Sequence, residues 1–164
     1  MKLAKTLRLL WIACLASVGV MGGLSWWLLQ APHAVALSHQ TSGTVSGLLV
    51  AMAVAEVSVA ILLFRFKWQP LCDQSLKLVW AGRLVNGDQG KATIKQLLTI
   101  GLLIMVCVES LAVYAVVLAL LGIDEPGLIL ACVVAAAAGL SAFYWQGILG
   151  AADLFRHVER LTRS

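Results

Sequence analysis

The chain contains four long apolar stretches that carry no lysine, arginine or histidine, and this feature limits its fold more than any other. A helix that crosses a bilayer needs about 20 mostly apolar residues, because its backbone must satisfy its own hydrogen bonds inside hydrocarbon. We therefore predict an all-α, polytopic membrane protein, a single domain over residues 1–164 with four transmembrane helices. The spans are expected at about 9–29, 43–64, 97–121 and 127–152.

The composition argues against a soluble enzyme. Hydrophobic residues make up 61% of the chain and charged residues 12%, whereas about a quarter of the residues in soluble proteins are charged. Walker loops, GxGxxG motifs and nucleophile elbows are missing from the sequence, so we expect no nucleotide hydrolysis or acyl transfer by this chain alone, and no cofactor. The four cysteines are scattered without the spacing of a metal site, and neither a metal nor a disulfide framework is predicted.

The positions of the basic residues predict the orientation in the membrane. All twelve lysines and arginines fall within residues 1–8, 65–95 and 153–164. Cytoplasmic loops retain such residues, so both termini and the 65–95 loop are expected in the cytoplasm. The membrane that the chain crosses is expected to be the inner membrane of the cell. Contact with anionic lipid head groups accounts for the basic blocks, and no nucleic-acid partner is expected.

The first span has an alternative interpretation as a secretory signal. Lys2, Lys5 and Arg8 precede the apolar run, and residues 34–36 read Ala-Val-Ala, which fits a cleavage site. A retained helix is favoured, because the run is longer than the usual 7 to 15 residues or so and the pair at 26–27 is Trp-Trp, typical of an interfacial anchor.

The cytoplasmic loop contains a second kind of helical pattern. Apolar residues recur near helical spacing over about 71–85, and Asp73 lies four residues before Lys77 with opposite charge. This pattern predicts an amphipathic helix on the membrane surface, with Trp80 as its interface anchor. Docking of the same helix against a partner subunit remains open.

Two glutamates lie within the predicted spans, Glu56 in the second and Glu109 in the third. A charged residue near mid-bilayer costs at least about 2.5 to 3.5 kcal/mol, so such residues usually face a protein interior or a wet cavity. The two carboxyl groups lie at depths that differ by about one helical turn, roughly 5 Å. With no basic residue in any span, each is most simply protonated, donating to Ser58, Ser110, Gln146 or a backbone carbonyl.

Two roles for these carboxyl groups remain open. A neutral, hydrogen-bonded acid can help helices associate or pair with a basic group of another subunit. A reversible proton or sodium site is the functional interpretation, and it is favoured more for Glu109 than for Glu56.

Small residues mark the faces where helices are expected to pack closely, because van der Waals contact replaces the hydrophobic effect in lipid. Four small-faced helices enclose little space, so we expect further copies of the chain or other membrane subunits as partners, besides the lipid bilayer. The predicted packing residues are Gly19, Gly23, Gly47, Ala51, Ala135 and Gly139.

The third span reads Val-Glu-Ser-Leu-Ala-Val-Tyr over residues 108–114, followed by an aliphatic run. This resembles the carboxylate helix of the rotary ATPase c-ring proteolipids, and the Gln-Gly-Ile-Leu-Gly-Ala-Ala-Asp of residues 146–153 resembles part of their glycine-rich helix. The resemblance implies that Glu109 is the ion-carrying carboxylate, that Ser110 and Tyr114 support its site, and that many copies form a ring. The chain differs from the family in its long 65–95 loop and in the order of the two helices.

Three functions follow as hypotheses. The first is a small subunit of a multi-subunit assembly that translocates protons or sodium through an intramembrane glutamate. The alternative is a non-catalytic structural membrane component of a secretion or conjugation-type machine. A small-molecule transporter is less favoured, because the sequence shows neither broken helices nor a convincing repeat.

Overall fold

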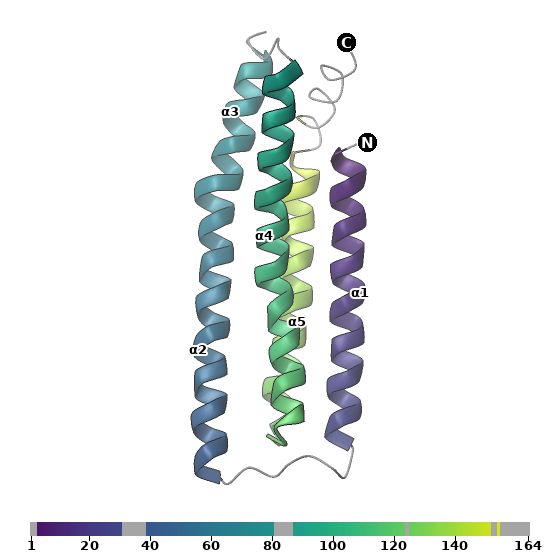
Figure 1. The fold of residues 1–164 in the computed structure, drawn as a ribbon, viewed down its shortest axis with the longest axis vertical. Helices are drawn as coiled ribbons and strands as arrows, with labels where there is room; N and C mark the ends of the chain where they lie inside the picture. The colour runs from purple at the N-terminus through teal and green to yellow at the C-terminus, as the bar shows by residue number, and fades with distance from the viewer. Residues whose placement is uncertain (1–2, 31–38, 81–86, 124, 152–153, 155–164) are drawn as a thin grey trace.

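The structure is a computed structural model that describes residues 3–30, 39–80, 87–123, 125–151 and 154. Every regular element in these ranges is helical, and four of the helices are long and apolar enough to cross a membrane, which confirms the predicted all-helical class. Figure 1 shows them running along one common axis with α4 in the centre. The four helices are α1 (Leu3–Gln30), α2 (His39–Leu63), α4 (Gly87–Leu120) and α5 (Pro126–Phe143).

A glycine turn reverses the chain between α4 and α5. Gly122 has a φ of 65°, a left-handed conformation that residues with a Cβ rarely adopt. Its N–H donates to the carbonyl of Ala119, and the N–H of Ile123 donates to that of Leu118. This hydrogen-bond pair is the Schellman ending of a helix, and Pro126 then starts α5 at a position where its missing N–H costs nothing.

The segment expected as a cytoplasmic loop is largely helical. A π-helical turn, η1 (Phe64–Trp68), joins α2 directly to α3 (Gln69–Trp80), and α4 begins at Gly87. Pro70 has no N–H and would crowd the carbonyl four residues before it, so the wider turn ahead of it relieves that clash. As a result α3 continues in the direction of α2 instead of turning across the end of the bundle, as a surface-lying helix would (Figure 1).

Basic residues lie in the half of the bundle where α1 and α4 begin, close to these two starts and on η1, which joins α2 to α3. This arrangement agrees with the charge asymmetry on which the predicted orientation depends, while the direction of insertion itself remains a prediction. The exposed members of the group are Lys5, Arg8, Arg65, Lys67 and Lys95, and Glu125 is exposed at the opposite end.

Helix α4 is the centre of the packing, and α2 is the least covered of the four. In the most apolar window of each helix, 56% of the α4 residues are buried but only 6% of the α2 residues. The core lies mainly between α1, α4 and α5, and Trp68 from η1 closes it at the basic end with 2% of its surface exposed. Trp11 joins α1 to α5 by donating from Nε1 to the carbonyl of Leu140 at 3.0 Å.

The predicted small-residue faces divide into two groups. A Cβ added at Gly139 would lie 2.7 Å from Val108 Cγ1, so this glycine allows α5 to approach α4 closely. A Cβ added at Gly19, Gly23 or Gly47 would meet nothing within 4 Å. Within one chain those three glycines therefore make no close helix contact, and Ala51 and Ala135 are exposed as well.

Candidate functional site

Glu56 on α2 lies against two hydroxyl groups of α4. The Tyr114 hydroxyl donates to Glu56 Oε1 at 2.6 Å, and Ser110 Oγ is hydrogen-bonded to Glu56 Oε2. Tyr114 is buried with 9% exposure, while Glu56 and Ser110 are partly buried. The three side chains form a polar site, here called the Glu56 site, inside the apolar interface between α2 and α4.

The spacing of the two hydroxyl residues explains why they meet the same partner. Ser110 and Tyr114 are four residues apart, so they share one face of α4. Glu109 is rotated by about 100° from Ser110 around the helix and points elsewhere. The four-residue spacing is visible in the sequence, but the resemblance to the proteolipid helix implied that both hydroxyl groups support Glu109.

Ser110 connects the carboxyl group to the backbone. Its Oγ is 2.8 Å from the carbonyl oxygen of Cys107 as well as being hydrogen-bonded to Glu56. A hydroxyl has a single proton, so Ser110 donates to only one of these two acceptors at a time. When Ser110 donates to the carbonyl of Cys107, a protonated Glu56 can donate in turn to Ser110 Oγ. When Glu56 is ionised, Ser110 donates its proton to the carboxylate instead.

Both protonation states of Glu56 keep hydrogen-bond partners, which lowers the cost of holding a polar group among apolar helices. The atoms that could coordinate a cation at this site are oxygen atoms of Glu56, Ser110, Tyr114 and Cys107. Oxygen is the ligand atom that hard cations prefer.

Glu109 faces the other side of α4. Its carboxyl group is within hydrogen-bonding contact of the thiol of Cys14 on α1, which is buried with 9% exposure. A thiol is a weak donor, so Glu109 has a weaker hydrogen-bond partner than Glu56 has in the two hydroxyl groups. The structure thus places the predicted site residues Ser110 and Tyr114 with Glu56 and leaves Glu109 at the α1–α4 interface.

Other predicted partners lie away from the glutamates. Ser58 donates to the carbonyl of Val54 on its own helix, and Gln146 lies at a separate cleft described below. The side chain of Trp80, the expected interface anchor, is outside the described residues. Across the part of the chain that the structure describes, no group of three or more His, Cys, Asp or Glu residues is placed to hold a metal ion.

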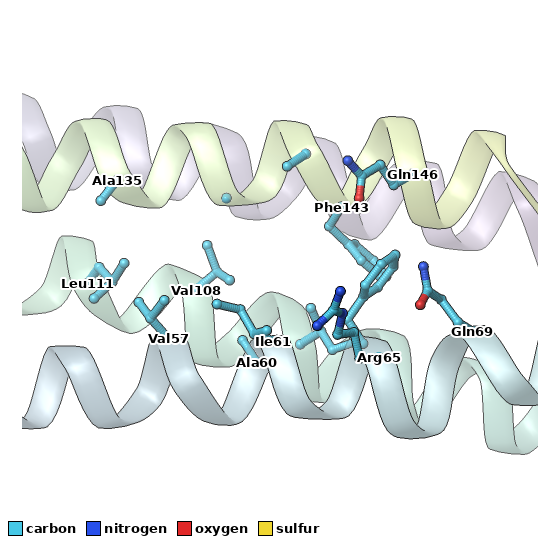
Figure 2. Close-up of a pocket in the computed structure, with 14 residues that line it drawn as sticks. Val57, Ala60, Ile61, Arg65, Gln69, Val108, Leu111, Ala135, Phe143 and Gln146 are labelled. Carbon is cyan, nitrogen blue, oxygen red and sulfur yellow. The ribbon is translucent and has the colours of Figure 1, made fainter.

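An apolar cleft of about 510 Å³ separates α2 from α5, and α4 forms its floor (Figure 2). Most of its lining is aliphatic, including Val57, Ile61, Val108 and Leu111. Polar groups lie only at its basic end, where Figure 2 shows Arg65, Gln69 and Gln146 around the opening.

Comparison with known proteins gives no relative to guide the interpretation. No protein-family model matches the chain, and no curated protein or solved structure matches it. The resemblance to the proteolipid helix therefore stays a prediction.

Replacing Tyr114 by phenylalanine tests whether the Glu56 site holds α2 to α4. The variant keeps the ring and removes the donor to Glu56 Oε1. We expect it to lower the free energy of unfolding by about 0.6 kcal/mol, the average for hydrogen bonds between membrane helices, and by no more than about 1.7 kcal/mol, the largest value for such bonds. The measurement is unfolding in mixed detergent–dodecyl sulfate micelles, followed by thiol labelling of Cys14. Tyr144→Phe is the matched control, because that hydroxyl makes no hydrogen bond within the described residues, and an equal loss there would contradict the assignment.

Proposed function

We propose that this chain is a small multi-pass subunit of an inner-membrane assembly and that it binds and releases a proton or a sodium ion at Glu56. The observation that carries the proposal is the convergence of the Tyr114 and Ser110 hydroxyl groups on the Glu56 carboxyl group inside an apolar helix interface. Ion coupling requires a carboxyl group that exists in two states at acceptable cost, and these hydroxyl groups support both states.

The proposal moves the ion-binding role from Glu109 to Glu56. Tyr114 and Ser110, the residues that the proteolipid resemblance assigns to the carboxylate, remain part of the proposed site. Assembly with other copies or other subunits is supported by the small-residue positions Gly19, Gly23 and Gly47, where no atom of the chain lies within 4 Å of an added Cβ.

Labelling with dicyclohexylcarbodiimide tests the proposal, because this reagent is apolar and attacks protonated carboxyl groups. We expect modification of Glu56, located by peptide mass spectrometry, and its complete loss in Glu56→Gln. Glu109→Gln is the matched control and is expected to leave the modification of Glu56 unchanged. Protection by sodium chloride, but not by potassium chloride, identifies sodium as the ion, and absence of protection identifies the proton.

A structural membrane component is the second candidate, favoured by the fact that the Glu56 hydrogen bonds also join α2 to α4. In that case Glu56 stays neutral, so its modification does not fall as the pH is raised from 5 to 9, and Glu56→Gln leaves the assembly and its activity in cells intact. Labelling at Glu109 alone would likewise overturn the proposed role of Glu56.

A further inference from the structure

The cleft between α2 and α5 combines two features that a phospholipid requires. Its walls are aliphatic for most of their length, and its basic end contains a cationic side chain, Arg65, beside the amide groups of Gln69 and Gln146 (Figure 2). Its volume of about 510 Å³ lies within the range of about 300 to 1,000 Å³ that is usual for small-molecule sites.

The length of the cleft matches one leaflet of a bilayer. Its lining on the α5 side extends from Ala135 to Gln146, which at a rise of 1.5 Å per residue is about 16 Å. The hydrocarbon core of a bilayer is about 30 Å thick, so one leaflet contributes about half of that. An acyl chain that enters from the Arg65 end would therefore fill the cleft and stop near the bilayer centre.

The charge at the opening favours an anionic head group. Arg65 is exposed, and among the described residues no carboxylate lies within ion-pair distance of it. A guanidinium group binds phosphate oxygens through paired N–H donors, and the two glutamine amides offer further donors. Basic pockets between transmembrane helices are known sites for acidic lipid head groups.

We propose that this cleft binds one anionic phospholipid, with an acyl chain between α2 and α5 and the phosphate at Arg65. The bound lipid fills the space between two helices that the chain itself leaves apart, and thereby supports α2, the least covered helix. The inference requires the helices to cross a bilayer but does not depend on ion binding at Glu56.

Native mass spectrometry of the full chain in detergent, titrated with phosphatidylglycerol or phosphatidylcholine, tests the proposal. We expect the wild-type chain to bind phosphatidylglycerol more tightly, and Arg65→Gln to lower that affinity about tenfold, as loss of a charge-assisted hydrogen bond does. Lys67→Gln is the matched control, because Lys67 is exposed on the same turn but does not line the cleft. An unchanged affinity in Arg65→Gln would overturn the proposal.

A second pair of variants tests the apolar part. Ala142 lines the cleft, whereas Val134 is 56% exposed on the same helix and does not line it. Ala142→Trp is expected to abolish binding of both lipids, and Val134→Trp to leave binding unchanged. If Ala142→Trp instead disrupts self-association with lipid binding intact, the cleft holds a helix of a second copy and the proposal is wrong. Glu56→Gln is expected to bind lipid as the wild type does, so the two proposals fail separately.

Discussion

Replacing Trp68 by alanine is expected to lower the free energy of unfolding by about 3 to 5 kcal/mol, the usual cost of deleting a large buried aromatic side chain. Trp68 is 2% exposed, and its ring packs against Phe143 with centroids 5.1 Å apart in an edge-on geometry. The same ring covers Gly101 on α4, where an added Cβ would lie 3.0 Å from it. One side chain thus joins η1 to both α4 and α5, and its removal leaves a cavity that the rigid helices fill poorly.

The measurement is dodecyl sulfate unfolding in mixed micelles, with thiol labelling of Cys14 as the readout, since that thiol is buried in the folded bundle. Trp145→Ala is the matched control, because Trp145 is 70% exposed and contributes little to the interior. We expect a change below about 0.5 kcal/mol for the control, as for other substitutions outside the core. Equal losses in the two variants would show that Trp68 does not anchor the bundle.

Replacing Gly139 by leucine is expected to have the second-largest effect. The first atom of the new side chain would overlap Val108 Cγ1, since even a Cβ would lie only 2.7 Å from it. Relief requires α5 to move away from α4, and overpacking of this kind costs about 1 to 3 kcal/mol. The separation would also widen the cleft between α2 and α5, because Gly139 and Val108 both line it.

Gly19→Leu is the control for this variant, since nothing lies within 4 Å of a Cβ at Gly19. We expect the folded monomer to retain its unfolding free energy, measured by the same micelle titration. If close packing at Gly19 occurs between copies, the control variant weakens self-association in detergent, measured by light scattering, while the fold persists. A loss of monomer stability as large as that of Gly139→Leu would contradict the packing at α4–α5.

The four long helices were predictable from hydropathy, whereas the helical content of residues 65–95 was only partly so. A helix was expected at about 71–85, and the structure has α3 at Gln69–Trp80. The uninterrupted connection to α2 was missed, because Pro70 suggests a break and the π-helical turn that accommodates it has no clear sequence signature. Helix α4 likewise begins at Gly87, about ten residues before the start of the predicted third span.

The packing residues show a similar division. An added Cβ at Gly139 would meet Val108, and added Cβ atoms at Gly22 and Gly101, which the sequence did not single out, would meet Val133 and Trp68. A GxxxG pattern such as that of Gly19 and Gly23 indicates which face of a helix carries small residues. It does not indicate whether the helix that packs on this face belongs to the same chain.

The sequence by itself determined that the chain forms apolar helices of membrane-spanning length, because a backbone in hydrocarbon must satisfy its own hydrogen bonds whatever its neighbours are. It also placed both glutamates within those helices. Only the tertiary structure decided which carboxyl group receives the Ser110 and Tyr114 hydroxyl groups. The partner of these hydroxyl groups depends on the rotation of α4 about its own axis relative to α1 and α2, and many weak packing contacts together set that rotation. As a result Glu56 has the stronger hydrogen-bond partners, and Glu109 has the thiol of Cys14.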